Sequence, residues 1–328
     1  MTTATLVVTF ELDDTARAVI GEALAGTGEI VSIAGLAPDA RAAALVGATA
    51  VMAWNIVQDL QPEELALLAG VKLVQLLPAG IDFIPLGLLP EGVPVASNAG
   101  AYSAPIAEHV LAMALAAAKR LGFEHAELAV GRFNQRTQNR MLAGGVCGIL
   151  GFGGIGAATA RLMRGVGMRV HAINRRGASD EATDWIGTPD RLDDMLAVAD
   201  VLVIATSLTR TTQKMIDARA LRLTKRDAIL VNIARGEIID EAALYAHLVA
   251  HPGFTACIDA WWVEPVRHGS FRVDHPFLSL PNVIGSPHNS ATAPGTREAG
   301  LRWAAANCRR VLVGEGVRNL VGLGDRLL

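Results

Sequence analysis

The sequence predicts an α/β protein of two domains, each built on a doubly wound parallel sheet. The chain has 328 residues, which is long for one ordinary domain and sufficient for two domains that each bury a core. Short apolar runs alternate with stretches of helical periodicity along most of its length. A glycine-rich turn at residues 151–156 also stands between a strand-like run and a helix-like segment.

The first hundred residues predict a small α/β domain. Helical stretches are expected at residues 15–25 and 62–68. Buried strands are expected at residues 6–10, 30–33, 50–54 and 73–77. After a loop at 98–103, residues 104–121 predict one long helix with Pro105 in its first turn, suited to a bridge between domains.

The glycine-rich turn predicts a dinucleotide site in a Rossmann-like domain. It follows a strand at residues 146–150 and precedes a helix at 157–166. Gly151 permits the tight turn, Gly153 lets backbone amides approach a diphosphate, and Gly156 lets the helix pack close to the strand. The predicted cofactor-binding residues of this turn are Gly151, Phe152, Gly153, Gly154, Ile155 and Gly156.

The next strand, residues 168–173, ends where an acidic residue would hold the ribose of NAD. The sequence instead has Asn174, Arg175 and Arg176. A carboxylate would repel a 2′-phosphate, whereas two guanidinium groups can bind one through charge-assisted hydrogen bonds. NADP(H) is therefore favoured, with NAD(H) possible. The alternative is that both arginines only begin a solvated loop at 177–184.

Composition predicts a cytoplasmic enzyme that acts on small molecules. The formal charge of −3 offers no basic surplus for nucleic acid or anionic lipid, and no uncharged apolar run is long enough to span a membrane. No signal peptide is expected, because the apolar run after Met1 has no cationic residues before it. Cys147, Cys257 and Cys308 are odd in number and far apart, so they predict buried thiols without a disulfide or metal site.

Further strands are expected at residues 201–205, 228–233, 255–258 and 283–286, followed by a helix at 293–313 that could return to the first domain. Arg235, Glu264 and His288 each come shortly after one of these strands, where reactive groups belong. An arginine can bind a carboxylate, a histidine can exchange a proton, and a glutamate can stabilise the protonated histidine. Together they predict reduction of a 2-oxo acid beside a nicotinamide.

Four motifs in the same order resemble the D-isomer-specific 2-hydroxyacid dehydrogenase family. They are residues 150–156, residues 232–240 with the sequence NIARGEIID, Asp259 through Glu264-Pro265, and Asn282 through Pro287-His288. The resemblance runs through nearly all of the chain. It implies that Arg235, Glu264 and His288 are the catalytic residues, and that the substrate is a small 2-oxo or 2-hydroxy acid such as glyoxylate or hydroxypyruvate.

The resemblance also implies a discontinuous substrate domain, residues 1–100 and 290–328, and a dinucleotide-binding domain at 101–289. Further cofactor contacts are implied for Thr206, Ser207, Ile233, Ala234, Asp259 and Ser290. Substrate contacts are implied for Trp54, Ala79 and Gly80, besides Arg235 and His288. Trp54 could equally belong to the core, and Gly80 could be only a turn glycine. A homodimer is implied, formed through the cofactor domains and the long helix, with residues 131–140 able to join it.

Some residues depart from this pattern or compete with it. Asn289 follows His288 where a small apolar residue is usual, and the roles of Asn289 and Trp262 stay open, whereas Trp261 is expected to pack. His109 competes with His288, but a capping or interface role would explain it. Two other functions remain: a dinucleotide-sensing corepressor, and a formate- or phosphite-type dehydrogenase, whose formate type pairs its histidine with glutamine.

Overall fold

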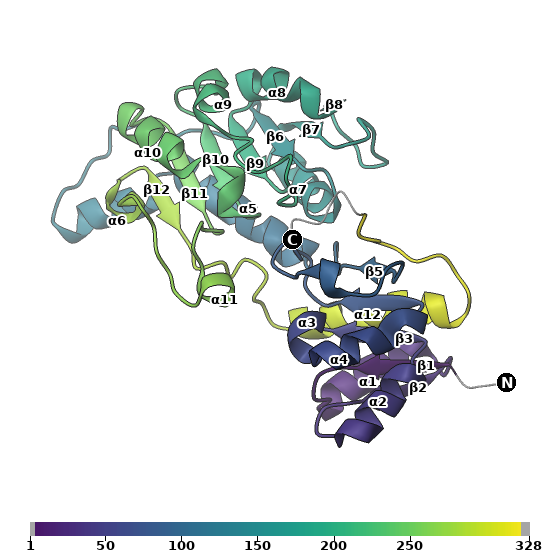
Figure 1. Ribbon diagram of the computed structural model, residues 1–328. Helices are drawn as coiled ribbons and strands as arrows, with labels where there is room; N and C mark the ends of the chain where they lie inside the picture. The colour runs from purple at the N-terminus through teal and green to yellow at the C-terminus, as the bar shows by residue number, and fades with distance from the viewer. Residues whose placement is uncertain (1–3, 323–328) are drawn as a thin grey trace. The chain divides into compact units, whose positions relative to one another are not determined.

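The computed structural model describes residues 4–322 and divides into two compact units (Figure 1). The first unit contains the chain up to Tyr102 and again from Pro294 onward, and the second is Ser103–Ala293. Both are parallel α/β units, as the sequence predicts.

The first unit contains a parallel sheet of five strands within the described residues, in the order β2-β1-β3-β4-β5. Its strands are β1 (Thr5–Val8), β2 (Glu29–Ser32), β3 (Ala50–Ala53), β4 (Leu73–Leu76) and β5 (Val95–Ala96). The four strands expected from the sequence are present, and β5 is an addition of only two residues. This order is that of a doubly wound sheet, in which ligands bind at the carboxyl ends of the strands.

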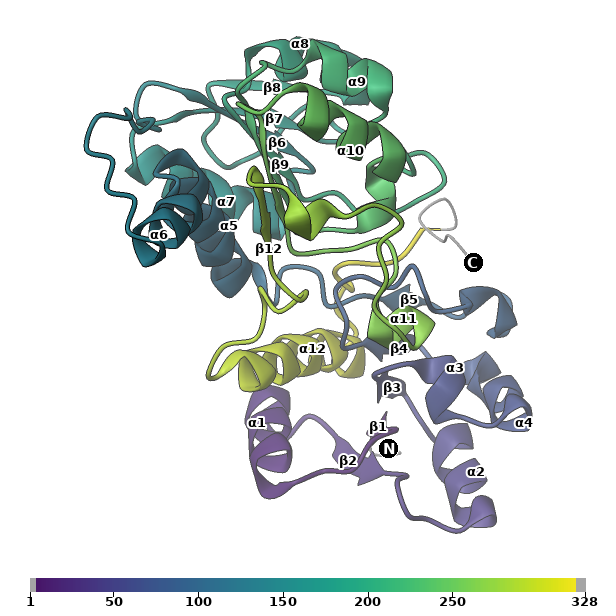
Figure 2. The ribbon, with the colours of Figure 1, turned by 90° about the vertical axis from the view of Figure 1, so that its left-hand side faces the viewer.

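Helices cover both faces of this sheet (Figure 2). They are α1 (Asp14–Leu24) and α12 (Thr296–Leu312) on one face, and α2 (Pro38–Val46), α3 (Ile56–Asp59) and α4 (Pro62–Leu65) on the other. Side chains of β1 alternate between the two cores. Leu6 and Val8 pack with α1 and α12, whereas Val7 packs on the opposite side with residues of α2 and α3. The C-terminal helix therefore returns to the first unit, as expected.

The second unit contains a parallel sheet of seven strands within the described residues, in the order β12-β11-β10-β9-β6-β7-β8. Its strands are β6 (Val146–Leu150), β7 (Arg169–Ile173), β8 (Trp185–Gly187), β9 (Val201–Ile204), β10 (Ile229–Asn232), β11 (Thr255–Ile258) and β12 (Val283–Gly285). Counted from β6, this is the Rossmann strand order with one added strand. The order reverses between β6 and β9, which is where such sheets bind a dinucleotide.

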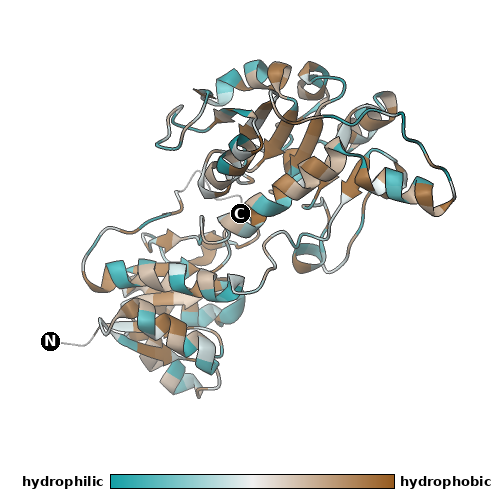
Figure 3. Cartoon of the chain, turned by 180° about the vertical axis from the view of Figure 1, so that it is seen from behind, coloured by the Kyte–Doolittle hydropathy of each residue, from teal (hydrophilic) through white to brown (hydrophobic). Residues whose placement is uncertain are grey.

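Helices also flank this sheet on both faces (Figure 2), and its strands are strongly apolar (Figure 3). The helices of this unit are α5 (Ser103–Ala118), α6 (Leu121–Ala129), α7 (Gly154–Gly165), α8 (Leu192–Val198), α9 (Ala218–Leu223), α10 (Glu241–Ala250) and α11 (Pro265–His268). Helices α5 and α7 pack against each other on one face, and α8, α9 and α10 lie on the other. Burial on both faces explains why β6, β9 and β10 consist almost entirely of buried residues.

One expectation about the second unit was wrong, and one strand was not predicted. The long helix expected at residues 104–121 ends at Ala118, and α6 starts after Arg120, whose backbone is left-handed with φ 54°. Helix α5 starts where the two units divide, between Tyr102 and Ser103. Strand β8 follows the polar loop after β7 and pairs with β7, a short element that the sequence pattern did not predict.

Within residues 4–322, none of the helices combines the length and the apolar character that crossing a membrane requires. The three cysteines are buried and unpaired, as expected. Burial raises the pKa of the Cys147 thiol to about 12.

Candidate active site

The glycine-rich turn connects β6 to α7 at the point where the strand order reverses. Gly151 has φ 98°, and a Cβ placed on it would lie 2.4 Å from the backbone nitrogen of Thr206, which follows β9. A Cβ on Gly156 would lie 2.4 Å from the carbonyl oxygen of Gly151. The strand ends and the start of α7 therefore approach so closely that only glycine fits at both positions.

The start of α7 has the geometry that a dinucleotide diphosphate requires. Gly153 is the residue before the helix, and no side chain caps the helix there. A Cβ on Gly153 would have no described atom within 4 Å, so the space in front of the helix is open. The first amides of a helix have no partner inside it and carry partial positive charge. Gly154 and Ile155 begin the helix, and Phe152 is buried. The residues present therefore fit a diphosphate.

The end of β7 carries the three polar residues expected to select the cofactor. The Asn174 side chain stays within its own turn, because its Nδ2 donates to the Ala178 carbonyl at 2.9 Å and its Oδ1 accepts from the Arg176 amide at 3.0 Å. Arg175 and Arg176 are both exposed at this strand end. Asn174 thus shapes the loop, while the guanidinium groups provide its positive charge.

The next strand ends, those of β9 and β10, carry four more residues expected near the cofactor. The Thr206 amide faces the glycine turn, and the Ser207 carbonyl accepts a hydrogen bond from the Thr212 hydroxyl at 2.7 Å. Ile233 is buried, and the Ala234 amide donates to Asn232 Oδ1 at 3.1 Å. These residues line the same carboxyl edge of the sheet as the glycine turn, because β6, β9 and β10 are adjacent and parallel.

Arg235 follows β10 in extended backbone conformation, with φ −146°. The Asn232 Nδ2 donates to the Arg235 carbonyl at 2.9 Å, and Arg235 Nη1 donates to the Ala234 carbonyl at 2.7 Å. The buried Asn232 therefore fixes both the Ala234 amide and the Arg235 carbonyl. This arrangement orients the Arg235 side chain from a rigid strand end.

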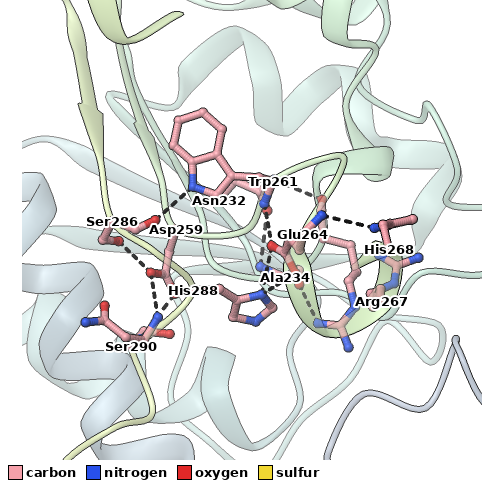
Figure 4. Close-up of polar contacts among 12 residues, drawn as sticks. Asn232, Ala234, Asp259, Trp261, Glu264, Arg267, His268, Ser286, His288 and Ser290 are labelled. Carbon is pink, nitrogen blue, oxygen red and sulfur yellow. Dashed lines mark hydrogen bonds and ion pairs between the residues drawn. The ribbon is translucent and has the colours of Figure 1, made fainter. Parts of the chain in front are cut away.

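Glu264 and His288 form a close pair in the second unit (Figure 4). The His288 Nδ1 lies 2.8 Å from both carboxylate oxygens of Glu264. Glu264 Oε1 also accepts from the Trp261 amide at 2.7 Å, and the Glu264 amide donates to His268 Nδ1 at 3.0 Å. With its Nδ1 held by Glu264, His288 keeps Nε2 as the ring nitrogen that can exchange a proton.

The pKa of Glu264 reflects this pairing. Burial raises the pKa of the Glu264 carboxyl, since its residue is only 6% exposed. The hydrogen bond and charge of His288, the Trp261 amide and the charge of Arg235 lower it more strongly, so the pKa lies below its usual value. Glu264 is therefore a carboxylate at neutral pH, and the charge of Arg235 contributes to holding it so.

Asp259 organises the loop that carries His288 (Figure 4). Its fully buried carboxylate accepts hydrogen bonds from the Ser286 hydroxyl at 2.5 Å, the Asn289 amide at 3.2 Å and the Ser290 amide at 3.3 Å. The Asp259 carbonyl accepts from the His288 amide at 3.0 Å. His288 has a left-handed backbone with φ 50°, an unfavourable conformation for a non-glycine residue. Asp259 thus holds His288 in a strained conformation at the site.

Three polar residues around Glu264 were not expected from the sequence. His268 accepts from the Glu264 amide, and the Arg267 Nη2 lies 2.8 Å from Glu237 Oε1. Glu237 lies two residues after Arg235, and Arg267 lies three residues after Glu264. This ion pair therefore links the segment that carries Arg235 to the segment that carries Glu264. Glu237 lies within the NIARGEIID motif, and Arg267 and His268 lie beside the Glu264-Pro265 motif. The pairing of Arg267 with Glu237 could not be read from the sequence, because the two residues are distant in the chain.

The residues expected to bind substrate from the first unit lie after neighbouring strands of its sheet. Trp54 follows β3, and Ala79 and Gly80 follow β4, which pairs with β3 in parallel. The Trp54 side chain is 46% exposed, so it does not belong to the core. Asp59 holds this turn, because its Oδ2 accepts from the Trp54 amide at 3.1 Å. Asp59 belongs to none of the motifs that point to a site.

The aromatic pair after β11 packs within the second unit. Trp261 is 3% exposed, and its Nε1 donates to the Ser286 carbonyl at 2.8 Å. Trp262 stacks on Phe277, and its Nε1 donates to the Ile239 carbonyl at 2.9 Å. The expected packing role of Trp261 is confirmed, and Trp262 has a similar one.

His109 also has a place near this loop. Its Nε2 lies 3.0 Å from the Ser286 hydroxyl oxygen and 3.8 Å from Asp259 Oδ1. The imidazole therefore contacts the segment after β12 instead of capping helix α5.

Comparison with known proteins assigns the chain to a family. The model for the NAD binding domain of the D-isomer specific 2-hydroxyacid dehydrogenases matches residues 111–290. The chain belongs to this family, and its second unit contains the nicotinamide-dinucleotide domain.

Named relatives include reductases and dehydrogenases. A glyoxylate reductase of Thermococcus kodakarensis is 39% identical over 165 residues, covering 50% of this chain and 47% of that protein. A hydroxypyruvate reductase of Thermotoga maritima is 28% identical over 236 residues, covering 71% of this chain and 75% of that protein. A D-3-phosphoglycerate dehydrogenase of Methanocaldococcus jannaschii is 30% identical over 247 residues, covering 74% of this chain and 46% of that protein. The chain therefore spans about half the length of this dehydrogenase and of the glyoxylate reductase.

The fold is also that of solved members of the family. A D-isomer specific 2-hydroxyacid dehydrogenase from Xanthobacter autotrophicus Py2, solved with NADPH and MES, superposes with a TM-score of 0.77 at 26% identity. The match covers 98% of each chain. The expected fold of two parallel α/β units is therefore confirmed.

Proposed function

We propose that this protein is an NADP(H)-dependent reductase that converts a small 2-oxo acid, such as glyoxylate or hydroxypyruvate, into a D-2-hydroxy acid. The observation that carries the proposal is the His288–Glu264 pair, with Nδ1 at 2.8 Å from both carboxylate oxygens. The charge of Arg235 acts on the same carboxylate. A proton donor and a carboxylate-binding guanidinium are the two groups that reduction of a 2-oxo acid requires.

The residues that would hold the cofactor are those at the carboxyl edge of the second unit's sheet. Gly153, Gly154 and Ile155 would hold the diphosphate at the start of α7, where a side chain on Gly153 would enter open space. Thr206, Ser207, Ile233 and Ala234 would contact the nicotinamide half, together with Asp259 and Ser290 after β11 and β12. When bound, NADPH supplies the hydride that reduces the carbonyl carbon.

The protein's own side chains would bind the substrate, donate the proton and orient the proton donor. Arg235 binds the substrate carboxylate through its planar guanidinium and polarises the neighbouring carbonyl. His288 donates a proton from Nε2 to the carbonyl oxygen. Glu264 holds the ring through Nδ1 and stabilises its protonated form, which fixes Nε2 as the donating atom.

In the first unit, we assign Trp54, Ala79 and Gly80 to substrate binding. Support comes from their position after neighbouring parallel strands and from the exposure of the Trp54 ring. Backbone amides at residues 79 and 80 are suited to a carboxylate, and an exposed indole is suited to limiting the size of the substrate side chain.

The preference for NADP(H) rests on the end of β7. Asn174 cannot repel a 2′-phosphate, and Arg175 and Arg176 supply two positive charges beside it. The relative from Xanthobacter autotrophicus Py2, in which NADPH was bound, makes this cofactor reasonable for the fold. NAD(H) would be used less efficiently.

The test is NADPH and NADH oxidation, side by side, with glyoxylate, hydroxypyruvate, pyruvate, phenylpyruvate and 2-oxoisocaproate. The double variant Arg175→Ala/Arg176→Ala should lose about tenfold or more in kcat/KM with NADPH and change little with NADH, because one or two charge-assisted hydrogen bonds are removed. Arg222→Ala, which removes an exposed arginine on α9, is the matched control. Equal losses with both cofactors would contradict the cofactor assignment, and tight cofactor binding without turnover would contradict the reductase.

We also propose that the protein is a homodimer joined through the second unit. Helix α6 has no buried residue, although its composition is apolar. It and the following segment expose large hydrophobic side chains: Leu121, Leu128, Val130, Phe133 and Met141. An apolar surface of this kind marks a protein contact, and a second copy would cover it.

Sedimentation tests the dimer. Phe133→Asp should produce monomers at micromolar concentration, because a charge would enter the contact. Val46→Asp is the matched control, since Val46 is 69% exposed on α2 of the first unit and Phe133 is 74% exposed. A wild-type monomer would overturn the proposal.

The three buried free thiols support a reducing, cytoplasmic location.

A further inference from the structure

His109, Ser286 and Asp259 form a chain of polar contacts that the proposed reaction does not use directly. His109 lies on α5, Ser286 follows β12, and Asp259 follows β11. The His109 Nε2 is 3.0 Å from Ser286 Oγ, and Ser286 Oγ is 2.5 Å from Asp259 Oδ1. Three elements that are far apart in the sequence therefore meet at one serine hydroxyl, within the second unit.

The direction of these hydrogen bonds follows from the number of available hydrogens. A carboxylate only accepts, so the single hydroxyl hydrogen of Ser286 is donated to Asp259. The serine oxygen can then only accept from His109, which requires a hydrogen on His109 Nε2. The chain of donation therefore runs from His109 to Ser286 to Asp259.

Asp259 connects this series of hydrogen bonds to His288, the proposed proton donor. Its carboxylate also accepts from the amides of Asn289 and Ser290, and its carbonyl accepts from the His288 amide. His288 is held between these contacts in a left-handed backbone, which needs support from its surroundings. If the Ser286 hydroxyl could rotate, the Asp259 carboxylate would lose a fixed hydrogen bond, and the position of His288 would be less well defined.

We propose that His109 is a positioning residue, which acts through Ser286 and Asp259 to hold the loop 286–290 and thereby His288. The proposal rests on the proposed function for the role of His288. Its structural part, that His109 orders this loop, concerns only the chain's own residues and can be tested without cofactor or substrate.

Amide hydrogen exchange in the protein without ligands tests the structural part. In His109→Leu the amides of Asn289 and Ser290 should exchange about fivefold to tenfold faster, because one hydrogen bond contributes about that factor. His109→Gln, which offers a donor at a similar position to Nε2, should restore slow exchange. Amides of β6 serve as the reference for a general loss of stability, and unchanged exchange at both amides in His109→Leu would overturn the proposal.

Two further measurements complete the test. Nitrogen-15 spectra of the histidine rings should place a hydrogen on Nε2 of His109, and an Nδ1–H tautomer would overturn the proposal. In NADPH oxidation, His109→Leu should lower kcat about fivefold to tenfold with KM for the acid within twofold, and His109→Gln should recover it. If the wild type shows no turnover, the proposed function fails, while exchange and ring spectra still decide the structural role of His109.

Discussion

Replacing Gly151 and Gly153 by alanine should damage the protein in two different ways, although the two glycines belong to one motif. Gly151 has φ 98°, and a Cβ there would lie 2.4 Å from the Thr206 nitrogen and 2.6 Å from the Ala205 carbonyl. Gly153 has φ −96° in extended backbone, and its added Cβ would meet no described atom within 4 Å. We therefore expect the first glycine to be required for folding and the second for binding of the proposed cofactor.

The magnitudes follow from these contacts. An alanine at positive φ costs about 1–2 kcal/mol, and forcing apart two strand ends adds a similar amount, so Gly151→Ala should lose about 3 kcal/mol of the free energy of unfolding. Gly153→Ala should change the free energy of unfolding by less than about 0.5 kcal/mol. Its methyl group would occupy the diphosphate position and remove one or two charge-assisted hydrogen bonds, which corresponds to about tenfold to hundredfold weaker cofactor binding.

Urea unfolding without ligands and NADPH titration by fluorescence measure the two effects separately. The expected result is a lowered unfolding midpoint for Gly151→Ala alone, and a raised Kd with an unchanged midpoint for Gly153→Ala. Wild-type affinity in Gly153→Ala would refute the placement of the diphosphate at the start of α7. An unchanged midpoint in Gly151→Ala would refute the steric reasoning about the turn.

Two other perturbations probe the charges of the second unit. Glu264→Gln should lower kcat about tenfold to hundredfold, because His288 loses the carboxylate that holds its ring through Nδ1. An unchanged kcat in NADPH oxidation would make Glu264 structural. His247 is different: burial first, and His251 beside it, lower its pKa to about 4 from the ordinary 6.5. Between those values the unfolded chain takes up a proton that the folded chain does not, so the free energy of unfolding should fall by about 2 kcal/mol as pH drops from 6.5 to 4. In urea unfolding, His247→Leu should reduce the pH dependence of the free energy of unfolding, whereas His125→Gln, at an exposed site, should leave it unchanged. A pH dependence in His247→Leu equal to that of the wild type would show that His247 is not its source.

Much of this architecture could be predicted because its causes are local. The glycine turn, the apolar strands and the polar residues after them each follow from short-range sequence patterns. Arg235, Glu264 and His288 each follow a strand in the sequence. Parallel pairing of β10, β11 and β12 gathers the ends of those strands at one edge of the sheet.

The remaining features depend on contacts between distant residues. The break between α5 and α6 falls at Arg120, two residues before Gly122, and no proline marks it. Strand β8 has three residues and is stabilised by pairing with β7. His109 and Ser286 are separated by 177 positions in the chain. No local pattern distinguishes such a histidine from one that only caps a helix, because its role depends on which strand end its helix packs against.

The pairing of Glu264 with His288 affects the stability of the fold, besides its proposed role in catalysis. Glu264 is 6% exposed, and its lowered pKa depends mainly on the imidazole, which offsets the effect of burial. Without the imidazole, the carboxylate keeps the Trp261 amide and the charge of Arg235 as partners but loses its strongest one.

His288→Ala should therefore lower the free energy of unfolding by about 1–3 kcal/mol at pH 7, because a buried carboxylate is left with fewer partners. The loss should shrink as pH falls toward the range where Glu264 takes up a proton, since the neutral acid is less costly to bury. The double variant His288→Ala/Glu264→Gln should recover most of the stability at pH 7, because the amide carries no charge. If the double variant is as unstable as the single one, the instability comes from the strained loop at His288 and not from the unpaired charge.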